Sequence, residues 1–301
     1  MKKAAKEKKY IVPNECSVGR WIAVLIVGLL LGCILSIPLF PFMQNTTDAF
    51  MGIPYTELFG ILAFAPMFWG MVIAVKVLGK TSLREFVLGI GGKVNKKECL
   101  TVFGLFAAGF LMPHLLILDK IHLRGTNPGE FGFLLLFMLL VTWMQTTWEE
   151  LIFRGIVIRW VCGNKVGYTK KAVIAGIVST LAFALAHAPN PEVTSQKGIQ
   201  MLMVLSCYMI PGMVCYIADL HFGSLLPGII IHWVNNFALF TLISSDVSAL
   251  SFPSLLVDNS PSSAAWTVAS TAMAYLPVLV YILLDLRRRR AGNADGAEGT
   301  L

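Results

Sequence analysis

The stretch FGFLLLFMLLVTWMQTTWEELIFRGIVIRWV, residues 131–161, decides the fold of this 301-residue chain. It is apolar over more than the roughly 20 residues that a helix needs to cross a bilayer. It also carries the adjacent carboxylates Glu149 and Glu150 and, four residues after the second, Arg154. Ionisable side chains inside an apolar span are costly and point by default to a functional site. We therefore interpret this stretch as a membrane-spanning helix that contributes to such a site.

Similar apolar runs recur along the whole chain. Hydrophobic residues make up 56% of it, charged residues only 14%, and the mean hydropathy is +0.72, whereas about a quarter of the residues of a soluble domain are charged. This composition excludes a water-soluble enzyme. It predicts an all-α integral membrane protein in which about eight transmembrane helices enclose a buried polar catalytic cavity. The predicted spans are 21–42, 58–77, 100–118, 131–161, 172–187, 199–218, 224–243 and 265–286.

The basic residues predict the orientation of the chain. There are 24 Lys and Arg against 17 Asp and Glu, for a net charge of +7, and all of the basic residues except Lys120, Arg124 and Lys197 fall on one side of the predicted spans. Because short basic loops stay in the cytoplasm, we expect both termini to be cytoplasmic, in the plasma membrane. The charge is then a topology signal, and no nucleic-acid partner is expected. The predicted organisation is a basic N-terminal segment (1–20), a membrane domain (21–286), and a basic, then disordered, tail (287–301).

The cysteines offer no metal site or disulfide framework. They are scattered, with no CxxC pair and no Cys/His spacing typical of a zinc ribbon, at Cys16, Cys33, Cys99, Cys162, Cys207 and Cys215. We interpret them as reduced, mostly apolar side chains.

Helical spacing sorts the polar residues of the spans into groups. Glu150 and Arg154 are four residues apart, so they share a helix face and can pair. Glu149 has no polar residue three or four positions further on, which makes it the freer carboxylate. In other spans, His187 follows Phe183 by four residues, and Asn236 follows His232 by four, so each of these two pairs also shares a face.

These groups supply the parts of a hydrolase that uses water directly. A carboxylate at hydrogen-bond distance from water can act as general base, with a histidine to assist it. Hydrogen-bond donors such as a His/Asn pair can stabilise the oxyanion that forms at the attacked carbonyl. The residues therefore favour a peptide hydrolase.

Three motifs carry a resemblance to a known family. Glu149-Glu150-Leu151-Ile152-Phe153-Arg154, Phe183-Ala184-Leu185-Ala186-His187 and His232-Trp233-Val234-Asn235-Asn236 match EExxxR, FxxxH and HxxxN in order, each in its own span. This pattern resembles the CPBP intramembrane proteases, also called the ABI family or type II CAAX prenyl endopeptidases, over about residues 131–245.

The resemblance implies roles for six residues. Glu149 would activate the attacking water with His187, and His232 and Asn236 would hold the oxyanion. Glu150 and Arg154 would support the site, although Glu150 could share the role of base.

The resemblance leaves the cofactor and the substrate open. The family is often labelled a metalloprotease, and Glu149, His187 and His232 would be an acceptable zinc set. The helical zinc motif HExxH, which would decide the question, is absent. We favour water activation that requires no cofactor, with zinc as the alternative. The expected partners are the bilayer and a peptide or protein substrate at the membrane, such as a prenylated CAAX tail, a leader peptide or a bacteriocin-related protein. The oligomeric state is left open.

Two other functions fit the same residues. The chain could be a catalytically silent CPBP-like scaffold or bacteriocin-immunity protein, or a proton-coupled transporter that uses Glu149 and the histidines as a relay. We interpret His114 and Phe183 as packing residues. One difficulty is depth: with straight helices, Glu149 would lie in the inner third of the membrane, His232 near the middle and His187 nearer the outer side.

Overall fold

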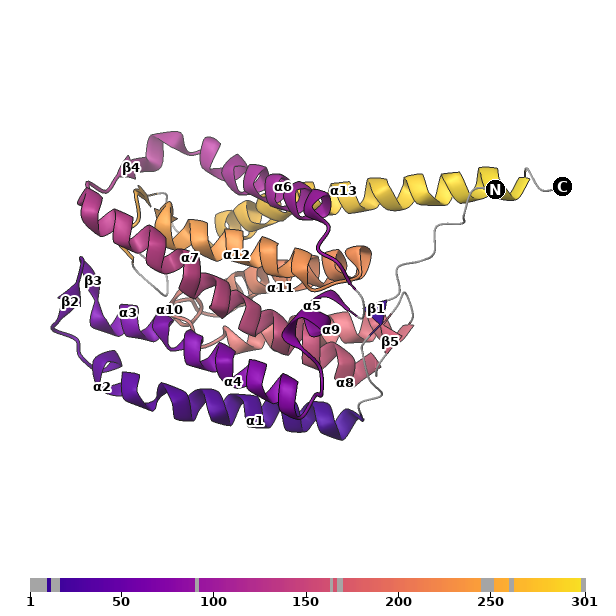
Figure 1. Ribbon diagram of the computed structural model, residues 1–301. Helices are drawn as coiled ribbons and strands as arrows, with labels where there is room; N and C mark the ends of the chain where they lie inside the picture. Colours follow the sequence, from indigo (N-terminus) through magenta and orange to yellow (C-terminus); the bar gives the residue numbers. More distant parts are fainter. Residues whose placement is uncertain are drawn as a thin grey trace.

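The computed structural model describes residues 10–11, 17–89, 92–162, 165–166, 170–244, 252–259 and 263–298. Most of the predicted N-terminal segment, including Cys16, and the last residues of the predicted tail lie outside this part. The described chain is a bundle of helices that run roughly side by side (Figure 1).

Within the described residues, six helical segments are long and apolar enough to cross a membrane. They are α1 (Val18–Ser36) with η1 (Ile37–Leu39) and α2 (Phe40–Met43), α3 (Tyr55–Leu62) with α4 (Phe64–Val77), α6 (Lys96–Leu115), α7 (Pro128–Glu150) with η3 (Leu151–Val157) and α8 (Ile158–Cys162), α11 (Ile199–Phe222), and α13 (Ala264–Glu298). These segments confirm an all-α integral membrane protein.

The predicted fifth and seventh spans correspond to helices that are shorter than these six segments. They are α9 (Lys170–Ala186), with 17 residues, and α12 (Leu226–Thr241), with 16. At 1.5 Å per residue such helices are about 25 Å long, less than the roughly 30 Å of the hydrocarbon core. The predicted count of eight spans is therefore not confirmed.

Short elements connect the long helices. Two are helices, α5 (Leu83–Leu88) and α10 (Pro191–Thr194). The strands form three small sheets: β1 (Tyr10–Ile11) with β5 (Lys165–Val166), β2 (Ala49–Phe50) with β3 (Ile53–Pro54), and β7 (Leu256–Asp258) between β4 (Ile121–Leu123) and β6 (Ile243–Ser244).

Helices α7, α9, α11 and α12 occupy the middle of the bundle. The α1/α4 pair lies on one side of them and the α6/α13 pair on the other (Figure 1). Glycines let α1 and α4 approach closely, because a Cβ on Gly70 would lie 2.5 Å from the backbone nitrogen of Gly32. Small residues at such contacts are typical of membrane helices.

The two ends of the bundle differ. Helix α1 begins, α5 lies and α8 ends at one end, and α13 extends beyond that end, while β2, β3 and β4 lie at the opposite end (Figure 1). Helix α13 continues through Glu298, past the predicted span end at 286 and into the tail that the sequence predicts to be disordered. The arginines at 287–290 favour the helical state, so propensity accounts for the first part of this continuation, whereas the two glycines within 291–298 do not favour it.

Candidate active site

The two adjacent glutamates lie at the end of α7, directly before a change in helical geometry. Glu149 and Glu150 are both buried, and the seven residues that follow them, η3, form a π-helix. Such π-helical segments within α-helices are frequent at functional sites. Arg154 lies in η3, and its Nη1 is 3.1 Å from Glu150 Oε1, with both side chains fully buried. The ion pair predicted from spacing is therefore present.

Glu150 also orients a histidine from another helix. The Nδ1 atom of His232, on α12, lies 2.8 Å from Glu150 Oε1. Because an ionised carboxylate can only accept hydrogen bonds, His232 donates its Nδ1–H to Glu150. Its Nε2 atom then points to the opposite side, toward Glu149.

Glu149 faces two imidazoles. Its Oε2 atom lies 3.5 Å from Nε2 of His232 and 3.9 Å from Nε2 of His187. Its Oε1 atom accepts a hydrogen bond of 3.3 Å from Gln145 Nε2, one turn earlier on α7. The sequence interpretation considered only residues after Glu149 and missed Gln145, although the spacing of four residues also works backwards.

His187 lies in the turn just after α9. Its Nδ1 is 2.8 Å from the carbonyl oxygen of Phe183, to which it can only donate. The neutral ring therefore carries its lone pair on Nε2, the atom that faces Glu149. The structure brings together the three side chains for which straight helices predicted different depths.

Asn236 completes the predicted set. Its Nδ2 atom lies 3.3 Å from Nε2 of His232, and its Oδ1 atom accepts a hydrogen bond of 3.0 Å from Asn235 Nδ2. Asn235 thus fixes which end of the Asn236 amide faces the site. All six residues predicted for the site, Glu149, Glu150, Arg154, His187, His232 and Asn236, are linked by these contacts.

Two further residues have the packing roles that the sequence indicates. The Phe183 ring lies 4.5 Å from the ring of His187 and 5.6 Å from that of His232, and the Arg154 guanidinium lies 4.3 Å from its centroid. Phe183 therefore fills the space beneath the polar groups. Nδ1 of His114 lies 2.7 Å from the Phe110 carbonyl oxygen, and the ring packs on that of Phe110, away from the site.

Among the described residues, no group of three or more His, Cys, Asp and Glu side chains is arranged to hold a metal ion. The candidate zinc set of Glu149, His187 and His232 is included in this statement. The described cysteines are free thiols, as the sequence indicates: Cys33, Cys99, Cys162, Cys207 and Cys215.

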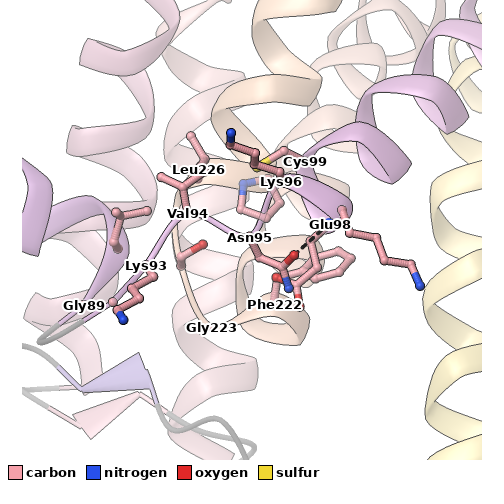
Figure 2. Close-up of a pocket in the computed structure, with 15 residues that line it drawn as sticks. Gly89, Lys93, Val94, Asn95, Lys96, Glu98, Cys99, Phe222, Gly223 and Leu226 are labelled. Carbon is pink, nitrogen blue, oxygen red and sulfur yellow. Dashed lines mark hydrogen bonds between the residues drawn. The ribbon is translucent and has the colours of Figure 1, made fainter.

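The site is enclosed. The side chains of Glu149 and His232 are 5% exposed, whereas that of His187 is 20% exposed and Asn236 is also partly buried, so the site is least covered beside His187 and Asn236. A pocket of about 640 Å³, shown in Figure 2, lies elsewhere, between the start of α6 and the α11–α12 connection. An apolar pocket of about 440 Å³ lies between α9, α11 and α13. None of the six site residues lines either pocket.

Fold and site together define an integral membrane protein with a buried glutamate–histidine centre on three separate helical segments. Residues 131–238 match the family model described as type II CAAX prenyl endopeptidase Rce1-like. The matched segment contains all six site residues and confirms the resemblance predicted from the three motifs. None of the curated proteins compared with the chain matches it.

Proposed function

We propose that the protein is an intramembrane endopeptidase that hydrolyses a peptide bond of a membrane-associated substrate. The observation that carries the proposal is the position of Glu149 Oε2, buried and facing Nε2 of His232 and of His187 at 3.5 and 3.9 Å. These separations are long for direct hydrogen bonds and suit a bridging water. The match to a CAAX-type endopeptidase family supports the same reaction class.

Glu149 and His187 are the groups that activate this water. Glu149 Oε2 and the lone pair on His187 Nε2 both accept hydrogen bonds. A water between them donates one hydrogen to each, and these two bonds fix its orientation. As its oxygen attacks the carbonyl carbon of the scissile bond, Glu149 takes up a proton. When the carbon–nitrogen bond breaks, that proton passes to the departing amine.

His232 and Asn236 stabilise the oxyanion. Their nitrogens Nε2 and Nδ2 are 3.3 Å apart, so one oxygen can lie about 2.9 Å from both. Because Nδ1–H of His232 already donates to Glu150, Nε2 donates to the oxyanion when the His232 ring carries both protons. Donors placed in advance in a water-poor site act strongly on developing charge. Glu150 and Arg154 support this arrangement, because Glu150 holds His232 by Nδ1 while Arg154 neutralises Glu150.

The substrate class follows from the matched family. We expect a prenylated CAAX tail or a leader-type peptide presented at the membrane. We also expect a location in the plasma membrane with both termini in the cytoplasm, consistent with the distribution of basic residues.

Reconstituted protein and a synthetic peptide test the proposal. Protein in liposomes is mixed with a fluorogenic peptide that ends in a farnesylated CAAX sequence, and the products are identified by mass spectrometry. Wild type should cleave the peptide, and Glu149→Gln should lower kcat about 10²- to 10⁴-fold. Glu130→Gln, in the first turn of the same helix, is the matched control and should leave kcat unchanged. Equal cleavage by wild type and Glu149→Gln would disprove the proposed base, and proton-coupled uptake without cleavage would support a transporter.

Chelation tests the proposed absence of a metal cofactor. Because the described side chains form no metal cluster, we expect activity to survive dialysis against 1,10-phenanthroline. Loss of cleavage that added Zn²⁺ restores would instead establish the zinc alternative.

A further inference from the structure

Three residues outside the three motifs form a network of contacts that reaches His187. Tyr208 lies on α11, Asn190 is the N-cap of α10, and Glu192 lies within α10. Sequence patterns indicated none of them, because they lie in a connection and on a helix outside the recognised motifs.

The ring of Tyr208 stacks on the imidazole of His187. The two ring centroids are 4.4 Å apart and the planes are inclined by only 22°. Phe183 contacts the same imidazole at 4.5 Å, with the planes inclined by 47°. The imidazole of His187 is therefore held between aromatic groups from α9 and α11.

His187 needs such support because of its place in the chain. It follows the last residue of α9 and lies in a turn, where helical neighbours no longer restrict its side chain. The hydrogen bond from Nδ1 to the Phe183 carbonyl fixes one point of the ring. The stack restricts rotation about that point, and this rotation sets the distance of 3.9 Å between Nε2 and Glu149 Oε2.

Tyr208 is itself fixed by polar contacts. Its hydroxyl donates to Glu192 Oε1 and accepts a hydrogen bond of 2.9 Å from Asn190 Nδ2, which also lies 3.3 Å from Glu192 Oε1. Asn190 and Glu192 belong to the connection that begins with His187. The three side chains therefore join this connection to α11 and close a loop around the imidazole.

We infer that Tyr208 is a positioning residue of the proposed active site: its ring holds the His187 imidazole with Nε2 directed at Glu149, and Asn190 and Glu192 hold the Tyr208 hydroxyl. This inference rests on the proposed function. Tyr208 takes no part in bond making or breaking, so its loss should change the orientation of His187 and the rate of the chemical step, and should leave substrate binding nearly intact.

Kinetics of three variants test the inference. Tyr208→Leu removes the stack and should lower kcat about 10- to 100-fold, the scale expected for misplacing a reacting group, with KM changed by less than about twofold. Tyr208→Phe keeps the stack and should stay within about threefold of wild type. Phe222→Leu is the matched control, because Phe222 is an aromatic residue of the same helix that stacks on Tyr281, away from the site. It should leave kcat unchanged for the folded protein.

Nitrogen NMR of histidine-labelled protein provides a readout that does not need catalysis. The His187 signal is identified by its absence in His187→Gln. Wild type and Tyr208→Phe should show one tautomer, protonated on Nδ1, and Tyr208→Leu should show averaged nitrogen shifts. Unchanged His187 shifts in Tyr208→Leu would overturn the inference, as would a kcat equal to wild type or a loss of kcat that Phe222→Leu reproduces. If wild type cleaves no peptide, the proposed function fails, and the NMR result alone decides the role of Tyr208.

Discussion

One carboxylate oxygen, Glu150 Oε1, forms an ion pair with Arg154 and accepts a hydrogen bond from His232. Removing the arginine would leave a fully buried carboxylate without its main countercharge. We expect Arg154→Met to lower the free energy of unfolding by about 3–5 kcal/mol, the usual result of breaking a buried pair on one side. Thermal unfolding in detergent and equilibrium unfolding measure the effect.

A double variant distinguishes the loss of the ion pair from the cost of leaving one buried charge without a partner. Glu150→Gln combined with Arg154→Met removes both charges and should recover part of the lost stability. Arg287→Met, at an exposed position on α13, is the control and should unfold like wild type. Equal stability of Arg154→Met and wild type would show that the pair contributes nothing to folding.

Variants of Asn236 and of its neighbour Asn235 distinguish an effect on catalysis from an effect on stability. Its Nδ2 atom is one of the two proposed oxyanion donors, and loss of one such donor typically costs about 10²- to 10³-fold in kcat. Asn236→Ala should show this loss with little change in thermal unfolding. Asn235→Ala removes only the contact to Asn236 Oδ1 and should lose less than about tenfold. The reverse order of the two variants would contradict the assignment.

At the level of residues, the sequence predicts those contacts that depend only on the spacing of side chains along one helix. The Glu150–Arg154 pair and the His232–Asn236 proximity follow from a separation of four residues. The contacts of Glu150 with His232 and of Tyr208 with His187 join residues on different helices. Their existence depends on which helices become neighbours and in which rotation, and a single sequence contains no local signal for that.

Helix ends and helix type were harder to predict than helix existence. Hydropathy located all of the long helices. It ended the fifth span one residue after α9 and extended the seventh span two residues beyond each end of α12. Pro189 was an available signal, because the residue before a proline disfavours helical geometry, and α9 ends at Ala186. Nothing in the local sequence distinguishes the π-helix η3 from an ordinary helical turn, since its residues are mostly apolar.

The start of α12 depends on a carboxylate of another helix. Asp219, on α11, accepts a hydrogen bond of 2.8 Å from the backbone N–H of Gly228 in the first turn of α12. Helix α12 has no side-chain cap of its own. His232 and Asn236 follow Gly228 by four and eight residues, so Asp219 caps the helix on the face that carries both site residues.

Removing this cap should weaken both stability and catalysis. Asp219→Ala leaves a buried N–H without an acceptor, which costs about 1–3 kcal/mol, and we expect a lower unfolding temperature and a lower kcat. Asp219→Asn keeps an acceptor oxygen and is the control. Gly228→Ala should resemble Asp219→Ala, because a Cβ there would lie 2.7 Å from Asp219 Oδ1. Wild-type stability and kcat in Asp219→Ala would contradict the capping role.

For the whole molecule, the site lies where α7, α9 and α12 meet in the middle of the bundle. Helix α12 packs on α7 and on α11, and α11 packs on α9, so α11 bridges the helices that carry His232 and His187. Helices α1, α4, α6 and α13 lie outside this core, and the family match at residues 131–238 covers none of them. The matched segment therefore coincides with the inner helices that carry the site.

The two ends of the bundle predict opposite exposure across a membrane. Thr46 is exposed near the β2–β3 end, and Lys96 is exposed at the start of α6. If the basic end faces the cytoplasm, a membrane-impermeant maleimide should label Thr46→Cys in intact cells and Lys96→Cys only after permeabilisation, each in a cysteine-free background. Arg124→Cys and Arg287→Cys provide a second position at each end and should repeat the two results. Labelling of Lys96→Cys but not of Thr46→Cys in intact cells would require the opposite orientation.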